Sequence, residues 1–326
     1  MSPDETGMVA AVDLGGTNIR VAVVDGMGAL RGFVVAPTDA ACGPDAVIDR
    51  ILSMIKDSLA QAQTDAAGLV AVGIGAPGPL DWKSGVIHEA PTHLPRWNGV
   101  RLADRISVAM GRPAFLEKDA NAAVLAEFAY GDNCGVANML YITVSTGVGG
   151  GLILDGRLWR GAYGSAGEFG HMTVDFEGPL CGCGNRGCIQ EISSGPNIAD
   201  WAIAQVASGK TSLLGDFEGG VQVTGRDVVV AAARGDEVSI SALDRAGRAV
   251  GFGIVSVAHL VNLDLVVVGG GIANAGAVLF DPIMRTVKEH LLASTAPSLR
   301  IAPWSLGEKV GILGAVASAR SRMASL

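Results

Sequence analysis

Residues 9–26 have the sequence VAAVDLGGTNIRVAVVDG, and this stretch decides the fold class. An apolar run that ends at Asp13 is followed by a glycine loop, a second apolar run over 19–24 and the turn dipeptide Asp25–Gly26. The glycine loop therefore joins two strands. In a dinucleotide-binding or P-loop unit, the loop would lead into a helix instead.

The same order of features returns later in the chain. Residues 139–156 have the sequence MLYITVSTGVGGGLILDG, with an apolar run, a loop of small residues and glycines, a second apolar run and another Asp–Gly turn. Two copies of this strand–loop–strand pattern indicate a duplicated fold with a nucleotide held between the halves.

Helical and strand-like patterns alternate between and after these two copies. Apolar residues recur at helical spacing in several segments, and short apolar runs have the length of buried strands. The expected helices cover 45–63, 121–130, 244–261 and a segment from Gly276 onward, and further strands are expected over 69–74 and 265–268. This alternation predicts an α/β fold.

The composition narrows the class of protein. The length of 326 residues corresponds to about two domains, and 49% hydrophobic against 17% charged residues excludes a disordered chain. The formal net charge of -8 disfavours a nucleic-acid partner. Glycine, at 46 residues, has roughly twice its usual share of about 7%, as expected where backbone approaches a ligand closely.

The expected location is the cytoplasm. Residues 1–8 show no basic-then-apolar secretory signal, and polar residues and glycines interrupt the most apolar region, 250–280, so no membrane span is predicted. Five cysteines are too few and too clustered for a disulfide framework, which indicates a reducing compartment.

The glycine loops predict a phosphate site without a lysine. No glycine cluster matches the dinucleotide fingerprint, and no Gly-Lys-Ser/Thr step occurs. Phosphates would then be held by backbone N–H groups, small hydroxyls and a metal ion. The alternative, that the glycines only mark hairpin turns, is weakened by the presence of two matched loops. The candidate residues are Gly16, Thr17, Ser145, Thr146 and Gly147.

A cysteine cluster gives the most specific local signal. Cys181, Cys183 and Cys188 follow His171, and three cysteines with one histidine complete a closed tetrahedral Zn²⁺ set, which is structural rather than catalytic. The alternative is a cluster of free thiols. Cys42 and Cys134 have no partners nearby in the sequence, so we expect them to be small buried residues.

The carboxylates are ambiguous when taken alone. Asp119 precedes the expected helix 121–130, so its plain interpretation is an N-cap. Asp13 and Glu168 could equally be ordinary strand-end and loop acids.

Several motifs together resemble the ROK family of bacterial sugar kinases. They occur in family order and extend from Val9 to about Gly314. The motifs are Asp13-Leu-Gly-Gly-Thr-Asn-Ile-Arg20, Asp119-Ala-Asn121, Ser145-Thr-Gly-Val-Gly-Gly-Gly151, Glu168-Phe-Gly-His171, Cys181-Gly-Cys-Gly-Asn-Arg-Gly-Cys188 and Gly269-Gly-Gly271.

The resemblance implies a two-domain, actin-like and hexokinase-type (ribonuclease H-like) fold with a zinc-binding loop, closing around a sugar and MgATP. The smaller domain would comprise 1–118 and 305–326, and the larger domain 119–304. The C-terminal helix, roughly 307–321, would pack on the first domain. A homodimer is also expected by family analogy.

The resemblance also implies a role for each motif. Asp119 would be the general base, and Asp13 would help to hold the metal and the phosphates. His171 would ligate zinc through one ring nitrogen and face the sugar with the other. The implied sugar contacts are Asn98, Lys118, Asp119, Glu168, His171 and Gln190. The implied ATP and phosphate contacts are Asp13, Gly15, Gly16, Thr17, Asn18, Ser145, Thr146, Gly147, Gly269, Gly270 and Gly271.

Two positions depart from the family pattern beside the expected sugar pocket. Lys118 stands where Asn is usual, and Gln190 stands where an acid is usual, with Glu191 one residue further on. We hypothesise that the substrate is a modified sugar or cyclitol, of the N-acetylmannosamine, sugar-acid or C7-cyclitol type, rather than plain glucose. The alternative is that Lys118 points to solvent and Gln190 replaces one hydrogen bond.

Two other functions were weighed against the kinase. A sugar-responsive repressor of the same family would need a basic winged-helix segment, but only twelve residues precede Asp13 and they are not basic. A non-catalytic sugar sensor is disfavoured because Asp13, Asp119 and both loops are present. The sequence leaves open the phosphate donor, which could be ATP, another nucleotide or polyphosphate, and the hydroxyl that is phosphorylated.

Overall fold

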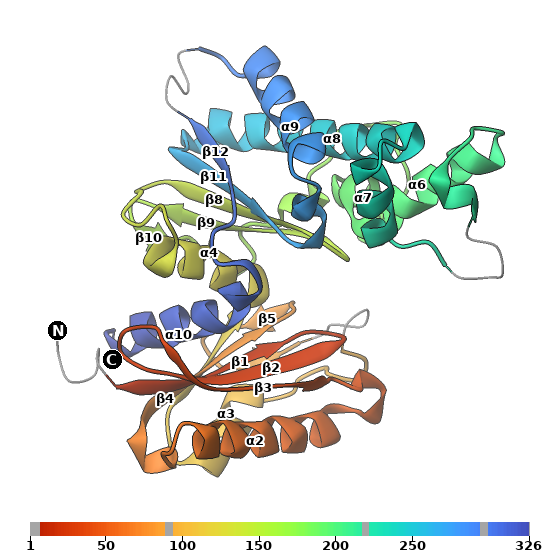
Figure 1. The fold of residues 1–326 in the computed structure, drawn as a ribbon. Coiled ribbons are helices and arrows are strands. Elements are labelled where there is room, and N and C mark those ends of the chain that lie inside the picture. The colour runs from red at the N-terminus through yellow and green to blue at the C-terminus, as the bar shows by residue number, and fades with distance from the viewer. Residues whose placement is uncertain (1–6, 89–93, 217–221, 294–298, 326) are drawn as a thin grey trace. The chain divides into compact units, whose positions relative to one another are not determined.

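A computed structural model describes residues 7–88, 94–216, 222–293 and 299–325. The chain forms two compact units, which Figure 1 shows in ribbon form. The first unit comprises 1–135, 158–166 and 305–326, and the second unit comprises 136–157 and 167–304.

The first unit is built on a five-stranded sheet. Its strand order is β3-β2-β1-β4-β7, in which β1, β2 and β3 are antiparallel neighbours, and β4 and β7 continue the sheet parallel to β1. The glycine loop thus joins two antiparallel strands, as predicted. The strands are β1 (Met8–Leu14), β2 (Asn18–Val24), β3 (Leu30–Pro37), β4 (Leu69–Ala76) and β7 (Ala114–Lys118), with a small separate pair, β5 (Leu80–Asp81) and β6 (Val86–Ile87).

Two helices cover each face of this sheet (Figure 1). The alternation along β1 divides the core, because Ala10 and Val12 face one apolar cluster while Val9 and Ala11 face the other. The first cluster includes α2 (Pro44–Gln61) and α3 (Leu102–Met110), and the second includes α4 (Asp119–Tyr130) and α10 (Val310–Met323).

Close backbone approach seats α10 between the sheet and α4. A Cβ added at Gly73 would lie 2.0 Å from the carbonyl oxygen of Ala315, and one added at Gly314 would lie 2.1 Å from that of Ala122. These two glycines are therefore required by packing, since any side chain there would push the helix away.

The domain boundary differs from the one expected after Lys118. Helix α4 belongs to the first unit because its buried Ala126 packs in one cluster with Ile312 and Val316 of α10. The first unit also includes 158–166, an excursion that sequence composition did not mark. The expected C-terminal helix does pack on the first unit, beginning at Val310 after a 3-10 turn, η6 (Gly307–Lys309).

The second unit repeats the sheet of the first. Its strand order is β10-β9-β8-β11-β12, with β8 antiparallel to β9 and parallel to β11, and with β11 parallel to β12. This order matches the first sheet strand for strand, which confirms the duplication. The strands are β8 (Met139–Val144), β9 (Val148–Leu154), β10 (Arg157–Leu158), β11 (Leu265–Gly269) and β12 (Arg300–Pro303).

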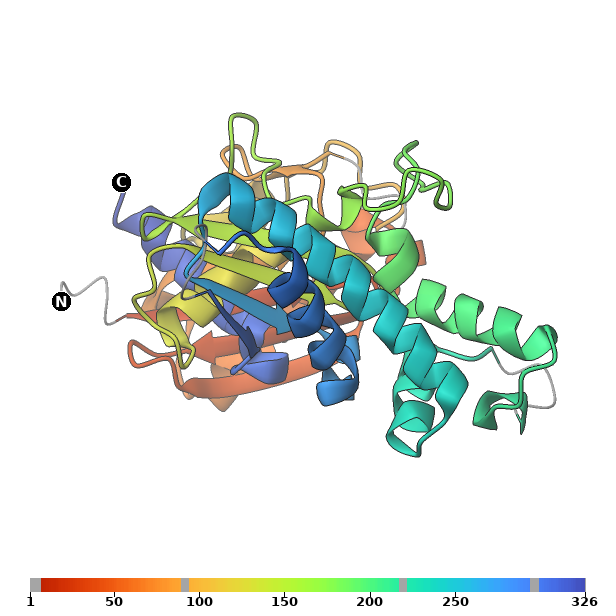
Figure 2. The same ribbon diagram turned by 90° about the horizontal axis from the view of Figure 1, so that it is seen from above.

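The long helix α8 organises the core of the second unit. It runs unbroken from Glu237 to Val261, as Figure 2 shows along its length, and Asp236 caps it by accepting a 2.9 Å hydrogen bond from the Ser239 amide. The helix packs closely on α9, because a Cβ at Gly247 would lie 2.7 Å from Pro282. The other helices are α5 (Gln190–Ser193), α6 (Gly195–Ala207), α7 (Gly225–Ala233) and α9 (Ala277–His290).

The short 3-10 turns complete the secondary structure. They are η1 (Ala40–Cys42), η2 (Ala66–Gly68), η3 (Phe169–His171), η4 (Leu213–Asp216) and η5 (Gly271–Ala275). Across the described ranges, none of the helices combines the length and the apolar character that a bilayer span requires.

Candidate functional site

The candidate catalytic carboxylates lie at one edge of the first sheet. Asp13 near the end of β1 pairs with Gly75 of β4, and Ala76 of β4 pairs with Lys118 at the end of β7. The carboxyl ends of these parallel strands therefore meet, which is where open α/β sheets bind ligands. Asp119 follows β7 immediately, so the structure brings together Asp13 and Asp119, the two acids to which the family resemblance gave catalytic roles.

Asp13 is held in a tight polar environment. Burial raises the pKa of its carboxyl, with a further rise from the nearby Asp119 charge, while Arg20 opposes both. Arg20 forms a 3.3 Å ion pair with Oδ2 of Asp13 from the neighbouring strand. A Cβ at Gly311 would lie 2.5 Å from Cγ of Asp13, so this glycine of α10 leaves the room that the carboxylate occupies. The roles of Arg20 and Gly311 were missed by sequence reasoning.

Asp119 is exposed, and it is the first residue of α4 rather than its N-cap. The cap position belongs to Lys118, whose side chain makes no capping hydrogen bond. Oδ1 of Asp119 accepts a 2.7 Å hydrogen bond from the Ala120 amide. The expected capping role is therefore wrong by one position, and the carboxylate remains accessible to a ligand.

The β1–β2 loop is braced by a buried threonine from the end of β3. The Thr38 hydroxyl donates to the Gly15 carbonyl at 2.7 Å, and its amide donates to the Thr17 carbonyl at 2.8 Å. Thr38 is fully buried, whereas Thr17 is exposed. The loop therefore presents the Thr17 side chain outward on a fixed backbone. Asn98, also in the first unit, is exposed beside the buried Trp97.

The second glycine loop lies against the glycine triplet of β11. Gly269 pairs with Thr143, and a Cβ at Gly270 would lie 2.4 Å from the Val144 carbonyl oxygen. The Ser145 carbonyl accepts a 2.7 Å hydrogen bond from the Gly195 amide at the start of α6. The structure thus brings the predicted phosphate loop Ser145–Thr146–Gly147 together with Gly269–Gly271.

Gln190 is directed at this loop. Its Oε1 lies 3.5 Å from the Val148 amide, which donates to it, and a Cβ at Gly147 would lie 3.3 Å from the same oxygen. The side chain that the sequence assigned to the sugar pocket therefore also braces the predicted phosphate loop.

Two glycines set Glu168 and His171 against β9. A Cβ at Gly167 would lie 2.5 Å from the Gly150 carbonyl oxygen, and one at Gly170 would lie 2.0 Å from that of Val148. Between them, Glu168 is exposed at the start of η3 and its carbonyl accepts a 3.1 Å hydrogen bond from the His171 amide.

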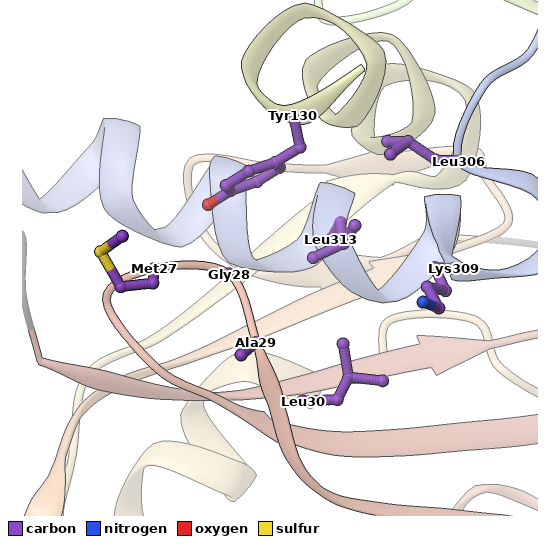
Figure 3. A pocket seen from close by; sticks show the side chains of 8 residues that line it. All are labelled: Met27, Gly28, Ala29, Leu30, Tyr130, Leu306, Lys309 and Leu313. Atoms are coloured by element: carbon purple, nitrogen blue, oxygen red, sulfur yellow. The ribbon is translucent and has the colours of Figure 1, made fainter. Parts of the chain in front are cut away.

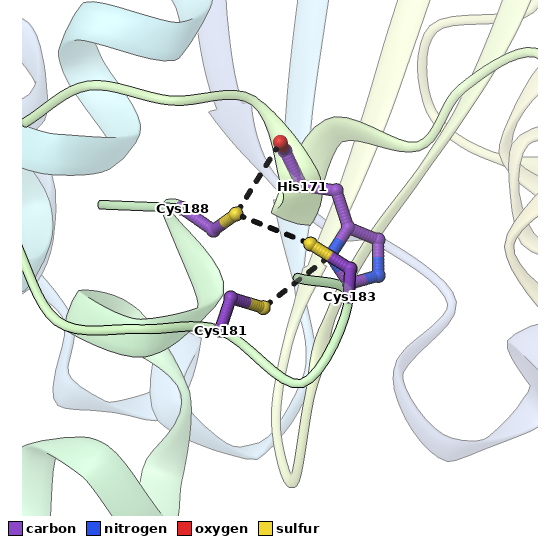
Figure 4. Close-up of side chains that lie close together, drawn as sticks. All are labelled: His171, Cys181, Cys183 and Cys188. Carbon is purple, nitrogen blue, oxygen red and sulfur yellow. Dashed lines mark hydrogen bonds between the residues drawn. The ribbon is translucent and has the colours of Figure 1, made fainter. Parts of the chain in front are cut away.

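The predicted zinc ligands converge in space (Figure 4). One ligand atom from each of His171, Cys181, Cys183 and Cys188 lies within 4.8 Å of the others. The Cys183 and Cys188 sulfurs are 3.7 Å apart, as are the Cys181 sulfur and Nδ1 of His171. Zn–S bonds of about 2.3 Å at tetrahedral angles place sulfur atoms about 3.8 Å apart. The donor set and its spacing therefore fit one tetrahedral metal ion.

The loop that carries these ligands bends at glycines. Gly184 has φ +93° and Gly187 has φ +62°, conformations that other residues rarely adopt. Burial raises the pKa of the Cys181 thiol to about 12, so a metal ion must displace a proton to bind there. Cys42 and Cys134 are exposed, so the expectation that they are buried was wrong. Both lie in loop or turn segments outside the apolar clusters.

A cavity of about 520 Å³ lies apart from the predicted site residues (Figure 3). It belongs to the first unit, where the β2–β3 turn faces α4 and α10. Its lining consists of Met27, Gly28, Ala29, Leu30, Tyr130, Leu306, Lys309 and Leu313.

The two-unit fold, the paired strand-end carboxylates and the cysteine loop together place the chain in one family. Residues 9–322 match the model of the ROK family, and the chain belongs to it. Its sugar-kinase members match over nearly the whole length. The glucokinase of Thermotoga maritima is 32% identical over 313 residues, which cover 96% of this chain and 97% of that protein.

Solved structures show the same relationship. A ROK family glucokinase from Streptomyces griseus, in complex with glucose and AMPPNP, superposes with a TM-score of 0.83 at 32% identity, covering 97% of this chain and 100% of the other. A ROK family transcriptional regulator, a homologue of the E. coli MLC protein, superposes with a TM-score of 0.85 at 27% identity, covering 95% of this chain and 77% of the other. The fold is therefore the hexokinase-type α/β fold of the ROK sugar kinases.

Proposed function

We propose that this protein transfers the γ-phosphate of ATP to a hydroxyl of a sugar, with Asp119 as the general base. The observation that carries the proposal is the pair of carboxylates at one sheet edge. Asp13 is sequestered and paired with Arg20, while Asp119 is exposed at the first turn of α4. Two acids in such different environments suit different tasks.

The base acts mainly through alignment. Phosphoryl transfer depends on positioning and charge stabilisation more than on covalent steps by the protein, so Asp119 orients the attacking hydroxyl and accepts its proton. Asp13 would supply a carboxylate for Mg²⁺, and the bound ion would neutralise the charge that develops on the phosphate oxygens.

The loops divide the remaining contacts. Thr17 and Thr146 are both exposed, and their hydroxyls bind phosphate oxygens. Hydrogen bonds from Thr38 and from the Gly195 amide fix the backbones of the two loops. Glu168 and His171 bind ring hydroxyls. His171, Cys181, Cys183 and Cys188 would hold Zn²⁺, and a bond from Nδ1 of His171 to the ion would leave Nε2 for the sugar. A homodimer remains a prediction from the family.

Two observations point to different sugar substrates. Glucokinases at 32% identity favour glucose. Lys118 and Gln190, which add positive charge and remove a negative one beside the expected pocket, favour a modified or acidic ring instead. Because Gln190 braces the phosphate loop, its effect on the sugar is indirect, and Lys118 becomes the residue to test.

The deciding experiment is a phosphorylation assay with MgATP and with polyphosphate. The acceptors are glucose, mannose, N-acetylmannosamine, N-acetylglucosamine, sugar acids and C7 cyclitols, with products identified by mass. Asp119→Asn is the inactive control. Asp57→Asn removes the same charge from an exposed helical position of the same unit and should leave the rate unchanged. Absence of any product from the wild-type protein would overturn the kinase.

A sugar-sensing role is the second candidate, and the TM-score of 0.85 against a transcriptional regulator favours it. Calorimetry with the same sugars separates the two. A sensor binds sugar without turnover in the presence of MgATP, whereas the kinase consumes it.

A further inference from the structure

The excursion 158–166 is attached to the first unit, although the chain on both sides of it belongs to the second. One contact dominates its attachment. Arg160 donates two hydrogen bonds to Oε2 of Glu117, from Nε at 2.9 Å and from Nη2 at 2.6 Å. Glu117 is 1% exposed and lies in β7, two residues before Asp119. A two-pronged ion pair at this depth fixes both partners in orientation.

The other oxygen of Glu117 reaches both sides of Asp119. Oε1 accepts a 3.2 Å hydrogen bond from the Lys118 amide and a 3.0 Å hydrogen bond from Nδ2 of Asn121. One carboxylate therefore ties together the residue before Asp119 and the residue two places after it, across the strand-to-helix junction.

Trp82 completes the attachment by packing between the excursion and α10. The Arg160 guanidinium lies 4.2 Å from the centre of the Trp82 ring, and a Cβ at Gly164 would lie 3.2 Å from the same ring. On the α10 side, Arg322 stacks 5.2 Å from the Trp82 ring centre and donates to the Trp82 carbonyl. These contacts limit the freedom of Arg160, so its grip on Glu117 is preorganised.

We propose that Glu117 and Arg160 are positioning residues for phosphoryl transfer, acting on the general base through the β7–α4 junction. The inference rests on the proposed function. Glu117 holds the Lys118 amide on one side of Asp119 and the Asn121 side chain on the other, and Arg160 holds Glu117. Their loss loosens Asp119 and its neighbour Lys118 but leaves Glu168, His171 and both glycine loops in place, so turnover falls more than substrate affinity.

The test compares Glu117→Gln, Arg160→Met and the double variant in steady-state kinetics. We expect each single variant to lower kcat by about 10- to 100-fold with less than about threefold change in either KM. The double variant should be no slower than the worse single variant, because the two residues act as one unit and the double change strands no buried charge. Arg160→Lys should restore part of kcat. Unchanged kcat, or losses that multiply in the double variant, would overturn the proposal.

Asp236→Asn is the matched control, because Asp236 is also buried and accepts several hydrogen bonds, but it caps α8 in the second unit. We expect it to lower the melting temperature without lowering kcat. Hydrogen exchange supplies a readout that does not need activity. Amides of 118–122 should exchange at least tenfold faster in Arg160→Met than in Asp236→Asn. If the wild-type protein phosphorylates no sugar, the proposed function and the catalytic positioning role both fail, and the exchange result then tests only whether Arg160 and Glu117 order the β7–α4 junction.

Discussion

The two glycine loops occupy equivalent places in two sheets of the same strand order, yet they are surrounded by different chemistry. The β1–β2 loop stands beside carboxylates, Asp13 and Asp119, and beside the start of α10. The β8–β9 loop stands beside a glycine triplet and the N-terminus of α6, with no carboxylate among the contacts described for it. Under the proposed function, the duplicated pattern supplies two phosphate-binding loops, with metal and base chemistry beside the first and nucleotide binding beside the second.

The base in the first unit should carry the largest single effect. Asp119→Asn keeps the shape of the side chain and removes its proton affinity, so we expect kcat to fall about 10³-fold with little change in sugar KM. Product quantified by mass at saturating MgATP measures this loss. If kcat of the variant stays within tenfold of the wild-type value, Asp119 of the first unit is not the base. The contrast drawn between the two loops then fails.

Substitution of Asp13 should cause the next largest loss of kcat, and the same substitution should raise stability. Asp13→Asn removes the proposed metal-holding carboxylate, so kcat should fall about 10²-fold. Because burial raises the folded-state pKa of Asp13, folding favours its protonated form. The carboxylate therefore costs no stability at pH below its unfolded pKa of about 3.9, its cost grows as pH rises from there to the raised folded pKa, and above that pKa the cost is constant.

Thermal melts at two pH values check that sign. The melting temperature of Asp13→Asn should exceed that of the wild type at pH 7, and the gap should shrink at pH 4. Asp57→Asn, on the exposed face of α2, provides the matched control for removal of one charge. A gap that widens toward acid pH would contradict the burial of the Asp13 carboxylate.

Metal removal should act on the second unit. Chelation, or Cys188→Ser, frees His171 from its ligand bond, so we expect sugar KM to rise about tenfold while MgATP KM stays within about twofold. Metal analysis identifies the ion, and retitration with Zn²⁺ should restore KM. Since bound Cys181 must lose a proton and its free thiol has a pKa of about 12, apparent metal affinity should increase with pH. If the protein contains no metal and chelation leaves the sugar KM unchanged, the cluster does not contribute to sugar binding.

Lys118 should have a smaller effect, confined to substrate choice. Lys118→Asn restores the residue usual in the family at this position. We expect the ratio of kcat/KM for an acidic or modified sugar to that for glucose to fall by up to about fivefold, because one partly exposed charge contact contributes up to about 1 kcal/mol. An unchanged ratio would show that Lys118 does not select the sugar.

Local patterns carried the sequence predictions that the structure confirms. The strands around both glycine loops follow from apolar runs and Asp–Gly turns, and the convergence of His171 with three cysteines follows from their confinement to 171–188. Contacts between distant segments were out of reach. Gly311 lies against Asp13, 298 positions away in the sequence. Arg160 forms an ion pair with Glu117, 43 positions away. Such pairs depend on how helices and strands pack, which no periodicity records.

The boundary after α4 was missed for the same reason. Helix α4 reads as apolar in any context, and only its packing against α10 assigns it to the first unit. Gln190 illustrates a different limit, since its place in the family motif indicated the sugar pocket while its side chain reaches the Val148 amide.

The way each loop is braced gives the finest test of the comparison. The first loop is held by the Thr38 hydroxyl on the Gly15 carbonyl and by the Thr38 amide on the Thr17 carbonyl. The second loop is held by the Gly195 amide on the Ser145 carbonyl and by the Gln190 side chain on the Val148 amide. Thr38→Val removes one buried hydrogen bond without changing shape, so we expect about 1 kcal/mol less stability and a two- to threefold rise in MgATP KM. Thr38→Ser keeps the hydroxyl and should keep KM. In the second loop, Gly195→Pro deletes the donor of the Ser145 bond, and it is the harsher change because the proline ring also meets the Ser145 carbonyl. If the loops are equivalent cradles for one nucleotide, both changes raise MgATP KM and spare sugar KM. A rise in sugar KM from either would separate the two loops in function.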